Sequence, residues 1–378
     1  MAQTAFWLCL AALAYIYAGY PLLVWWLARR RPSRRPPLPW AGAVSIVLVA
    51  YNEAPRLAAR LRNLFASSIN GQILEVLVGS DGSTDATATV VAGFPDFRVR
   101  SWLFDERRGK PAVLNDLVPQ CRGEVVVFVD ARQELAPTAL EQLVANFSDP
   151  GVGVASGELV LRSLPGESTA ATGVGFYWTY EKWIRSNESR FRSVPGATGA
   201  FYAMRRELFR PIPPQTLLDD VVIPMQAIEQ GFRCVLERGA EAFDAPSQSS
   251  ASEGVRKRRT IAGCAQLILQ QPRWLLPWRN PIWWEFCSHK LARLASPALL
   301  AAALALNVSL ISQPLYAVLL SAQASFYAAA ATGWAYQQVG RRSTLFGPCL
   351  MFVALNAATC AALWDALRGR FRATWQKA

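Results

Sequence analysis

Histidine is nearly absent from this chain of 378 residues, which contains only one, His289. A histidine base or a metal site built from several histidines would depend on that single residue, which lies beside a long apolar segment. We therefore expect any general base to be an aspartate or a glutamate.

Paired cysteines with metal-binding or redox spacing are also absent. The chain has an odd, scattered set of seven, Cys9, Cys121, Cys234, Cys264, Cys287, Cys349 and Cys360. Such a set is typical of a reducing compartment. No glycine-rich phosphate loop lies near the first expected strand, which argues against the competing class of nucleotidyltransferases.

Charge is scarce, because charged residues make up 17% of the chain and hydrophobic residues 52%. A soluble domain usually has about 25% charged residues. The apolar excess lies at the two ends of the chain, and 378 residues leave room for one catalytic domain between them. This distribution predicts a membrane protein.

The first apolar segment, Phe6 to Ala28, carries no charge and is long enough to cross about 30 Å of hydrocarbon. A basic cluster follows it, Arg29, Arg30, Arg31, Arg34 and Arg35. The positive-inside rule then puts the N-terminus outside and the next domain in the cytoplasm. The alternative, a buried core helix with a basic loop, would usually show a polar stripe, which this segment lacks.

The C-terminal end contains two or three further candidate spans. Residues 294–340 carry no charge and suffice for two crossings with a turn near Gln313, and 345–364 is a third candidate. Four crossings in all would put the C-terminus outside, yet a basic tail favours the inside: Arg368, Arg370, Arg372 and Lys377. Either one segment is re-entrant or interfacial, or the tail is an exception to the rule.

The net charge of +12 fits a membrane location. Much of it lies beside the apolar segments, where Lys and Arg attract anionic lipid head groups. We expect membrane lipids as partners and no nucleic acid, because no nucleic-acid-binding motif accompanies the arginine clusters.

Between the apolar ends, strand-like and helix-like stretches alternate. The strands are expected at 44–50, 73–79, 98–104 and 124–129, and the helices at 55–67, 84–92 and 110–119. This order predicts an α/β domain with a mostly parallel sheet covered on both faces. Ligands of such sheets bind beyond the carboxyl ends of the strands.

Carboxylates follow three of these strands. The first strand ends in Tyr51-Asn52-Glu53, the second in Asp81-Gly82 with Asp85 beyond, and the fourth in Asp130-Ala131-Arg132. Each motif alone could be a helix cap or a turn. Their coincidence at three strand ends predicts a shared site.

These motifs resemble the inverting family 2 glycosyltransferases of the GT-A fold, a group that includes cellulose and hyaluronan synthases and bacterial exopolysaccharide transferases. The resemblance runs from about 45 to 260. It implies a GT-A (Rossmann-like nucleotide-diphospho-sugar transferase) domain flanked by transmembrane helices. The expected parts are an N-terminal transmembrane helix with its basic segment at 1–39, the GT-A domain at 40–250, interfacial amphipathic helices at 251–293 and a C-terminal transmembrane region at 294–378.

The resemblance also implies roles for individual residues. The nucleoside would be held by Tyr51, Glu53 and Asp81, while Lys110 lies near the donor and Asn115 shapes the same pocket. Asp130 would be the first carboxylate of the metal-binding DxD motif, and Asp220, beside Asp219, would be the catalytic base. Arg132 and Arg259 would lie near the donor phosphates.

The implied chemistry needs a divalent cation, Mg²⁺ or Mn²⁺, to neutralise a departing nucleotide diphosphate. Mg²⁺ often keeps only one or two protein carboxylates, so Asp130 alone could suffice. An acceptor hydroxyl must lose a proton as it attacks, and direct attack inverts the anomeric centre.

Two departures from the family pattern matter. The second acid of the DxD motif is replaced by Arg132, which could contact a phosphate or weaken metal binding. Where processive members carry Gln-x-x-Arg-Trp, residues 256–260 match only at Arg259, so long-chain polymerisation is not indicated. A catalytically impaired scaffold or regulator is the alternative.

Three further segments are expected to serve the acceptor or the membrane. The small residues of 196–203 occupy the place of the family's acceptor-binding loop, and the aromatic helix at 177–191 is either core-packing or faces the acceptor or the membrane. Tryptophans at 274, 278, 283 and 284 favour a segment, 252–290, on the bilayer surface.

The sequence thus predicts a hexosyltransferase in exopolysaccharide or cell-envelope glycan synthesis. Its donor would be a nucleotide sugar, UDP-linked by expectation, and its acceptor a lipid-linked or polysaccharide glycan. A multi-pass protein of the cell inner membrane with a cytoplasmic catalytic domain is expected.

Overall fold

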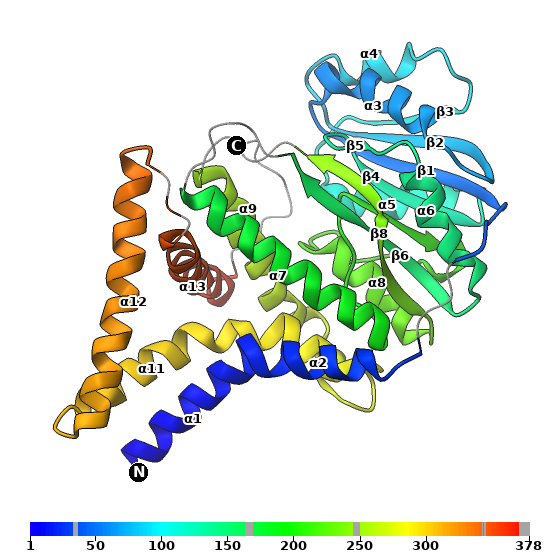
Figure 1. The fold of residues 1–378 in the computed structure, drawn as a ribbon. Helices are drawn as coiled ribbons and strands as arrows, with labels where there is room; N and C mark the ends of the chain where they lie inside the picture. Colours follow the sequence, from blue (N-terminus) through cyan, green and yellow to red (C-terminus); the bar gives the residue numbers. More distant parts are fainter. Residues whose placement is uncertain (33–36, 163–168, 245–249, 342, 344, 370–378) are drawn as a thin grey trace.

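The computed structural model describes residues 1–32, 37–162, 169–244, 250–341, 343 and 345–369. An α/β domain lies on one side of the molecule, and the long helices from both ends of the chain extend away from it on the other (Figure 1). The helices α7 and α9 run between these two parts (Figure 1).

The domain is built on one eight-stranded sheet with the order β3-β2-β1-β4-β7-β6-β8-β5. Its strands are β1 (Ala43–Ala50), β2 (Gln72–Asp81), β3 (Val99–Phe104), β4 (Val125–Asp130), β5 (Glu134–Leu135), β6 (Val152–Leu161), β7 (Phe201–Arg205) and β8 (Arg233–Asp244). The four predicted strands, β1 to β4, pair in parallel, as expected. In the other half β7 is antiparallel to β4 and β6, β8 is parallel to β6, and β5 is antiparallel to β8.

Helices cover both faces of the sheet, as predicted. Successive strand residues point to opposite faces, so β1 contributes Ile46 and Leu48 to one buried cluster and Val47 to the other. The first cluster includes α3 (Ala54–Ala66), α4 (Thr87–Ala92) and α6 (Ala139–Ala145), and the second includes α5 (Lys110–Leu117) and α8 (Asp219–Glu229). The site at the strand ends therefore rests on a fully packed core.

One predicted helix begins later than expected. The helix predicted from Thr84 begins at Thr87, because the Asp85 carboxylate accepts the backbone N–H of Thr87 at 2.9 Å. The Asn52 side chain accepts the backbone N–H of Thr84 at 2.8 Å, which fixes the preceding loop. Asp85 thus forms an Asx-turn directly before the helix, whose N-cap residue is Ala86.

In the part of the chain that the structure describes, four helical stretches are long and apolar enough to cross a membrane: Ala2–Arg29, Trp283–Ser309, Pro314–Gln338 and Phe346–Leu367. The first comprises α1 (Ala2–Ala14), a π-helical turn η1 (Tyr15–Gly19) and α2 (Tyr20–Arg29). The second comprises α10 (Trp283–Glu285), the π-helical η6 (Phe286–Leu291), η7 (Ala292–Ala295) and α11 (Ser296–Ser309), and α12 (Pro314–Gln338) and α13 (Phe346–Leu367) are the others. The apolar segments of the sequence therefore form the predicted helices.

The helices α7 (Thr169–Phe191) and α9 (Ser250–Gln270) connect the domain with these apolar helices. Ile184 of α7 packs with Tyr20 and Val24 of α2, and both α7 and α9 pack against α13. For α7, the structure therefore favours packing against an apolar helix over a place in the core of the domain.

The tryptophans of the expected interfacial segment do not share one environment. Trp278 is exposed, but Trp274 is fully buried in the core cluster that contains α5 and α8. The expectation that all four favour the bilayer surface is therefore wrong for Trp274, because a large apolar ring gains more from complete burial.

The ends of the apolar helices meet at two places. Near the N-terminus, Gln3 donates to Gln313 at 2.8 Å and the rings of Phe6 and Tyr316 are 5.3 Å apart. Near the domain, Arg258 of α9 donates to Asp365 of α13 at 2.8 Å. The end of α13 thus lies beside α9, whereas the turn between α11 and α12 lies beside the N-terminus.

Candidate active site

Lys110 connects the end of β4 with the start of α8. It is the first residue of α5, and its Nζ lies 2.9 Å from Asp130 Oδ1 and 3.4 Å from Asp219 Oδ2. Burial lowers the pKa of Lys110, but the carboxylates of Asp130 and Asp219 outweigh it and raise the pKa above its usual value. The ammonium therefore stays charged and holds the two carboxylates together.

Asp220 follows Asp219 in the first turn of α8 but occupies a different environment. Burial, together with the charge of Asp219, raises the pKa of Asp220 to about 6, and the cations Lys290, Lys110 and Arg259 oppose the rise. The two carboxylates therefore differ, as expected for side chains that diverge by about 100° on a helix. Asp219 binds Lys110, and Asp220 has the pKa of a group that exchanges protons near neutral pH.

The predicted acceptor loop lies directly against Asp220. The backbone N–H of Ala197 donates to the carbonyl oxygen of Asp220 at 2.7 Å. A Cβ atom added at Gly199 would lie 2.9 Å from Asp220 Oδ2, so a larger residue there would force the Asp220 side chain to shift. Gly196 has φ +131, a conformation that also favours glycine.

Arg259 approaches the carboxylates from α9. Its Nη2 donates to the carbonyl oxygen of Leu217 at 3.3 Å, two residues before Asp219. Burial lowers the pKa of Arg259, while Asp219, Asp220 and Asp130 act in the opposite direction. The arginine of the partial sequence motif thus faces the same carboxylates as Lys110.

The residues predicted to hold the nucleoside lie at the ends of β1 and β2. Asp81 accepts the backbone N–H groups of Arg108 at 2.7 Å and Gly109 at 2.9 Å, so it fixes the loop that precedes Lys110. The guanidinium carbon of Arg107 lies 3.8 Å from the centre of the Tyr51 ring. Glu53 is 3.5 Å from Arg56, and its backbone N–H donates to Thr87 at 2.8 Å.

Asn115 binds a neighbouring loop by both ends of its amide. Its Nδ2 donates to the carbonyl oxygen of Ile212 at 2.7 Å, and its Oδ1 accepts the Ile212 N–H at 2.9 Å. The predicted role in shaping the pocket would therefore be indirect, through the segment that leads to α8.

Arg132 pairs with a residue from the far side of the sheet. Its Nη2 lies 2.6 Å from Asp244 Oδ2, and Gln133 donates to the same oxygen at 2.9 Å. Asp244 is almost fully buried, whereas about half of the Arg132 side chain is exposed. The basic residue of the altered DxD motif thus neutralises a buried acid.

The donor set suits a hard divalent cation that takes most of its ligands from a substrate. Within the described ranges, no group of three or more His, Cys, Asp or Glu side chains could hold a metal ion. Asp130 uses one oxygen for Lys110, and its side chain remains 30% exposed. A single accessible carboxylate fits Mg²⁺ or Mn²⁺ bound chiefly by phosphates and water.

Sequence reasoning included Tyr202 only as part of the expected acceptor-binding loop at 196–203, and it missed Arg185. Tyr202 of β7 stacks on Phe128 with ring centres 4.5 Å apart, and burial, with the charges of Asp219, Asp220 and Asp130, raises its pKa. Arg185 of α7 binds the loop beneath Asp220. Both lie in apolar or aromatic stretches, and an arginine within an aromatic helix is the one signal the sequence offered.

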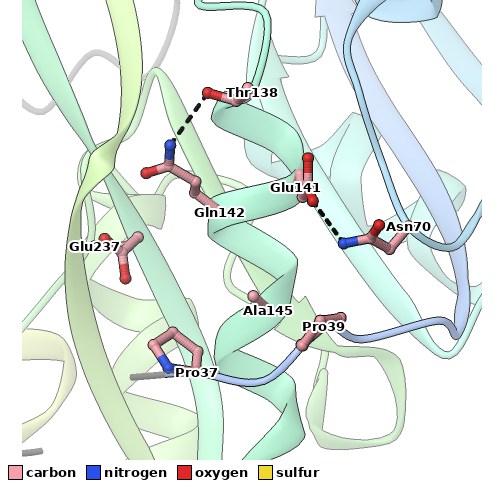
Figure 2. Close-up of a pocket in the computed structure, with 8 residues that line it drawn as sticks. All are labelled: Pro37, Pro39, Asn70, Thr138, Glu141, Gln142, Ala145 and Glu237. Atoms are coloured by element: carbon pink, nitrogen blue, oxygen red, sulfur yellow. Dashed lines mark hydrogen bonds between the residues drawn. The ribbon is translucent and has the colours of Figure 1, made fainter. Parts of the chain in front are cut away.

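A separate pocket of about 460 Å³ lies elsewhere on the domain, beside α6 (Figure 2). Its polar lining is held by bonds of its own, from Asn70 to Glu141 and from Gln142 to Thr138 (Figure 2). None of the predicted site residues lines it.

Residues 45–212 match the model of a known family, Glycosyl transferase family 2. The chain carries a family 2 glycosyltransferase domain. The family predicted from the strand-end motifs is thereby confirmed, and the segments that the family model matches include Lys110 and Asp130.

Curated relatives of this chain are similar over part of their length. Succinoglycan biosynthesis protein ExoO of Rhizobium meliloti (strain 1021) is 31% identical over 125 residues, which cover 33% of this chain and 35% of that protein. An N-acetylglucosaminyltransferase of the same strain is 30% identical over 180 residues, 46% of this chain and 41% of the relative. The chain spans less than half the length of these relatives.

A solved structure resembles this chain along nearly its whole length. Mannosyltransferase PcManGT from Pyrobaculum calidifontis, in complex with GDP-Man and Mn²⁺, superposes with a TM-score of 0.71 at 23% identity. The match covers 97% of this chain and 99% of that one. The predicted GT-A fold is confirmed.

Proposed function

We propose that this protein is an inverting glycosyltransferase that transfers a sugar from a nucleotide-diphosphate sugar to a lipid-linked or polysaccharide acceptor. The observation that carries the proposal is the convergence of Lys110, Asp130 and Asp220 at one edge of the sheet of a family 2 domain. The similarity to a succinoglycan biosynthesis protein supports exopolysaccharide or envelope glycan synthesis as its setting.

The donor would lie at the carboxyl ends of β1, β2 and β4. Tyr51, Glu53 and Asp81 would hold its nucleoside, and we expect a UDP-sugar. Lys110 and Arg259 are cations that face the site carboxylates, so they would neutralise the diphosphate as the sugar leaves. Asp81 would act partly through the backbone of Arg108 and Gly109, which it fixes.

Asp130 would hold Mg²⁺ or Mn²⁺ through its exposed carboxylate oxygen. When bound, such an ion stabilises the charge that develops on the leaving diphosphate. The Lys110 ammonium already bonds to the other oxygen of Asp130, so the side chain is oriented before the donor arrives. The Arg132–Asp244 pair lies outside this role and leaves Asp130 as the one acid of the motif.

Asp220 would remove the proton from the acceptor hydroxyl. A general base is most effective when its pKa is close to the working pH, and the pKa of Asp220 is raised to about 6. Gly199 and Ala197 would let the acceptor approach closely, since neither has a large side chain. Attack on the face opposite the leaving diphosphate inverts the anomeric configuration.

The arrangement of the helices supports a three-crossing topology with a cytoplasmic catalytic domain. The N-terminus lies beside the turn that joins α11 and α12, so α1–α2, α11 and α12 would each cross the membrane. The Arg258–Asp365 bond holds the end of α13 beside α9, so α13 would lie along the membrane surface. The basic residues after α13 would then be cytoplasmic, in agreement with the positive-inside rule.

Reporter fusions at the C-terminus test this topology. We expect a fused fluorescent protein that folds only in the cytoplasm to fluoresce, and a fused phosphatase active only outside to stay inactive. The opposite pair of results would show that α13 crosses the membrane as a fourth span.

A donor screen tests the function itself. Purified protein would be mixed with UDP-, GDP- and other nucleotide-linked sugars, with and without membrane lipid extract, and release of the nucleoside diphosphate measured. We expect one donor to give release that depends on the extract and is lost in Asp130→Asn. If the wild-type protein released no more nucleoside diphosphate than Asp130→Asn with any of the donors, the result would favour the scaffold alternative.

A further inference from the structure

Arg185 is a buried arginine that binds the loop beneath the catalytic carboxylate. It is 9% exposed and lies on α7, outside the sheet. Its Nη1 donates to Thr198 Oγ1 at 3.0 Å, and its Nη2 donates to Ser156 Oγ at 3.0 Å and to the carbonyl oxygen of Gly196 at 3.4 Å. The planar guanidinium thus fixes three groups at once, which a lysine ammonium does with less geometric precision.

The hydrogen bonds around Arg185 continue within the loop. The backbone N–H of Thr198 donates to Ser156 Oγ at 2.8 Å, and Ser156 is itself fully buried on β6. One side of the segment 196–199 therefore rests on Arg185 and Ser156. Both hydroxyls are satisfied by these bonds, so little of the network is free to rearrange.

The other side of the same segment contacts Asp220. Ala197 donates its N–H to the Asp220 carbonyl oxygen at 2.7 Å, and the Gly199 backbone packs against the Asp220 side chain. Lys110 also approaches the carbonyl oxygen of Gly199 at 3.5 Å. A shift of the loop by a few tenths of an ångström would therefore move the carboxylate that we propose as the base.

The helix that carries Arg185 is itself fixed to the second apolar stretch. Glu181, Arg185 and Glu188 lie four and three residues apart, which puts them near one face of α7. His289 of η6 bonds to Glu181 Oε1 at 2.7 Å and to Glu188 Oε1 at 2.8 Å, and Arg293 bonds to Glu181 Oε2 at 2.9 Å. The single histidine of the chain thus bridges two acids of α7.

We propose that Arg185 is a positioning residue for Asp220, which acts through the segment 196–199 and on a helix anchored by His289. This inference rests on the proposed function, in which Asp220 is the base. Arg185 has no bond to Lys110, Asp130 or Asp219 among those described, so its effect would be on where the base lies rather than on donor binding.

The test compares Arg185→Gln with Arg185→Lys and with Arg190→Gln. Arg190 is the matched control, because it is an exposed arginine of the same helix that bonds only to the carbonyl oxygen of Arg31 within the described structure. We expect Arg185→Gln to lower kcat about 10- to 100-fold, the usual cost of misplacing a catalytic group. Donor affinity should change less than about threefold, Arg185→Lys should recover part of kcat, and the control should match wild type.

A purely structural role for Arg185 would not move the acid limb of the pH profile of kcat. That limb reports Asp220, whose pKa depends on its distances to Asp219, Lys290, Lys110 and Arg259. We expect Arg185→Gln to shift the limb, whereas Arg190→Gln leaves it at the wild-type position. A wild-type kcat and limb in Arg185→Gln would overturn the inference.

A second variant covers the case in which Arg185→Gln does not fold. Thr198→Val removes one acceptor of Arg185 without removing its charge, and it should lower kcat less than Arg185→Gln. If both fold, the double variant should lose little beyond Arg185→Gln, because the two side chains belong to the same hydrogen-bond network. Additive losses, or a wild-type kcat in Thr198→Val, would contradict the coupling.

Hydrogen exchange separates failure of this inference from failure of the proposed function. The amides of Ala197 and Thr198 are hydrogen-bonded, so they should exchange slowly in wild type and faster in Arg185→Gln, whatever the reaction is. Unchanged exchange would refute the positioning role. An inactive wild type with faster exchange in Arg185→Gln would refute only the proposed function.

Discussion

Replacing Lys110 with methionine should destabilise the protein strongly and in a pH-dependent way. Only 10% of the Lys110 side chain is exposed, and its ammonium lies 2.9 Å from Asp130 and 3.4 Å from Asp219. At an effective dielectric constant of about 20, each pair is worth roughly 5 kcal/mol before desolvation. Removing one partner of a buried pair typically costs about 3–5 kcal/mol, because the remaining charge is left uncompensated.

The sign of the pH dependence follows from Lys110 itself. Burial lowers the pKa of Lys110, but the carboxylates of Asp130 and Asp219 outweigh it and raise the folded-state pKa above that of the unfolded chain. A raised lysine pKa contributes stability that is fully present below the unfolded pKa of about 10.4 and is lost as the pH rises through the folded pKa. The stability difference between wild type and Lys110→Met should therefore be large at pH 8 and smaller at about pH 11.

The assay is thermal unfolding of the purified protein in detergent at both pH values. Lys182→Met is the control, because Lys182 also pairs with a carboxylate, Glu158 at 2.7 Å, but Glu158 keeps a second partner in Arg238. We expect the control to show a smaller loss of stability and normal turnover. Equal losses for Lys110→Met at pH 8 and about pH 11 would refute the assignment of Lys110 as the countercharge of the site.

Three further predictions concern the same site. Burial and the charge of Asp219 raise the pKa of Asp220 to about 6, so kcat should fall about tenfold for each pH unit below that value. A pH–rate profile at saturating donor measures this fall, and a flat profile down to pH 5 would exclude Asp220 as the base. Asp130→Asn should remove most activity, and a chelator should abolish wild-type turnover until Mg²⁺ or Mn²⁺ is added back. Full activity in excess chelator would contradict the metal-dependent mechanism. Gly199→Ala should lower kcat about 10- to 100-fold with nearly normal donor affinity, because the new methyl group would lie 2.9 Å from Asp220 Oδ2. Gly175→Ala, where an added Cβ meets nothing within 4 Å, is its control, and equal rates for the two variants would contradict the tight approach.

The sequence predicted those parts of the fold that short-range patterns encode. Of the four parallel strands, β1 and β4 are nearly continuous apolar runs, and such runs are typical of strands buried on both faces. The long apolar helices were equally predictable, because each contains a long apolar stretch of the sequence. In contrast, β8 contains five charged residues, Arg233, Glu237, Arg238, Glu241 and Asp244, and no local pattern identifies it as a strand inside the sheet.

The sequence also predicted which acids lie at the strand ends, but not their partners. Lys110 bonds to Asp219, which is more than one hundred residues away, and Arg132 bonds to Asp244. Such pairs depend on the order of the strands, which residue spacing does not encode. The divergence of Asp219 and Asp220 was predictable, because it follows from helix geometry alone.

The role of His289 illustrates the same limit. Sequence reasoning judged it by its position beside an apolar stretch and found no catalytic partner for it. In the structure it bridges Glu181 and Glu188, residues of a helix that the sequence could not orient. A buried polar group needs hydrogen-bond partners, but the sequence does not say where in the chain those partners lie.

The most direct test of the central claim is the rate of sugar transfer by Asp220→Asn and Asp219→Asn, measured together with donor affinity. Removing a general base typically costs about 10²- to 10⁴-fold in rate and leaves donor binding largely intact. We predict this result for Asp220→Asn and a smaller loss for Asp219→Asn, whose carboxylate binds Lys110. If Asp219→Asn were inactive and Asp220→Asn active, Asp219 would be the base in place of Asp220. Fast transfer by both variants would contradict the proposed mechanism.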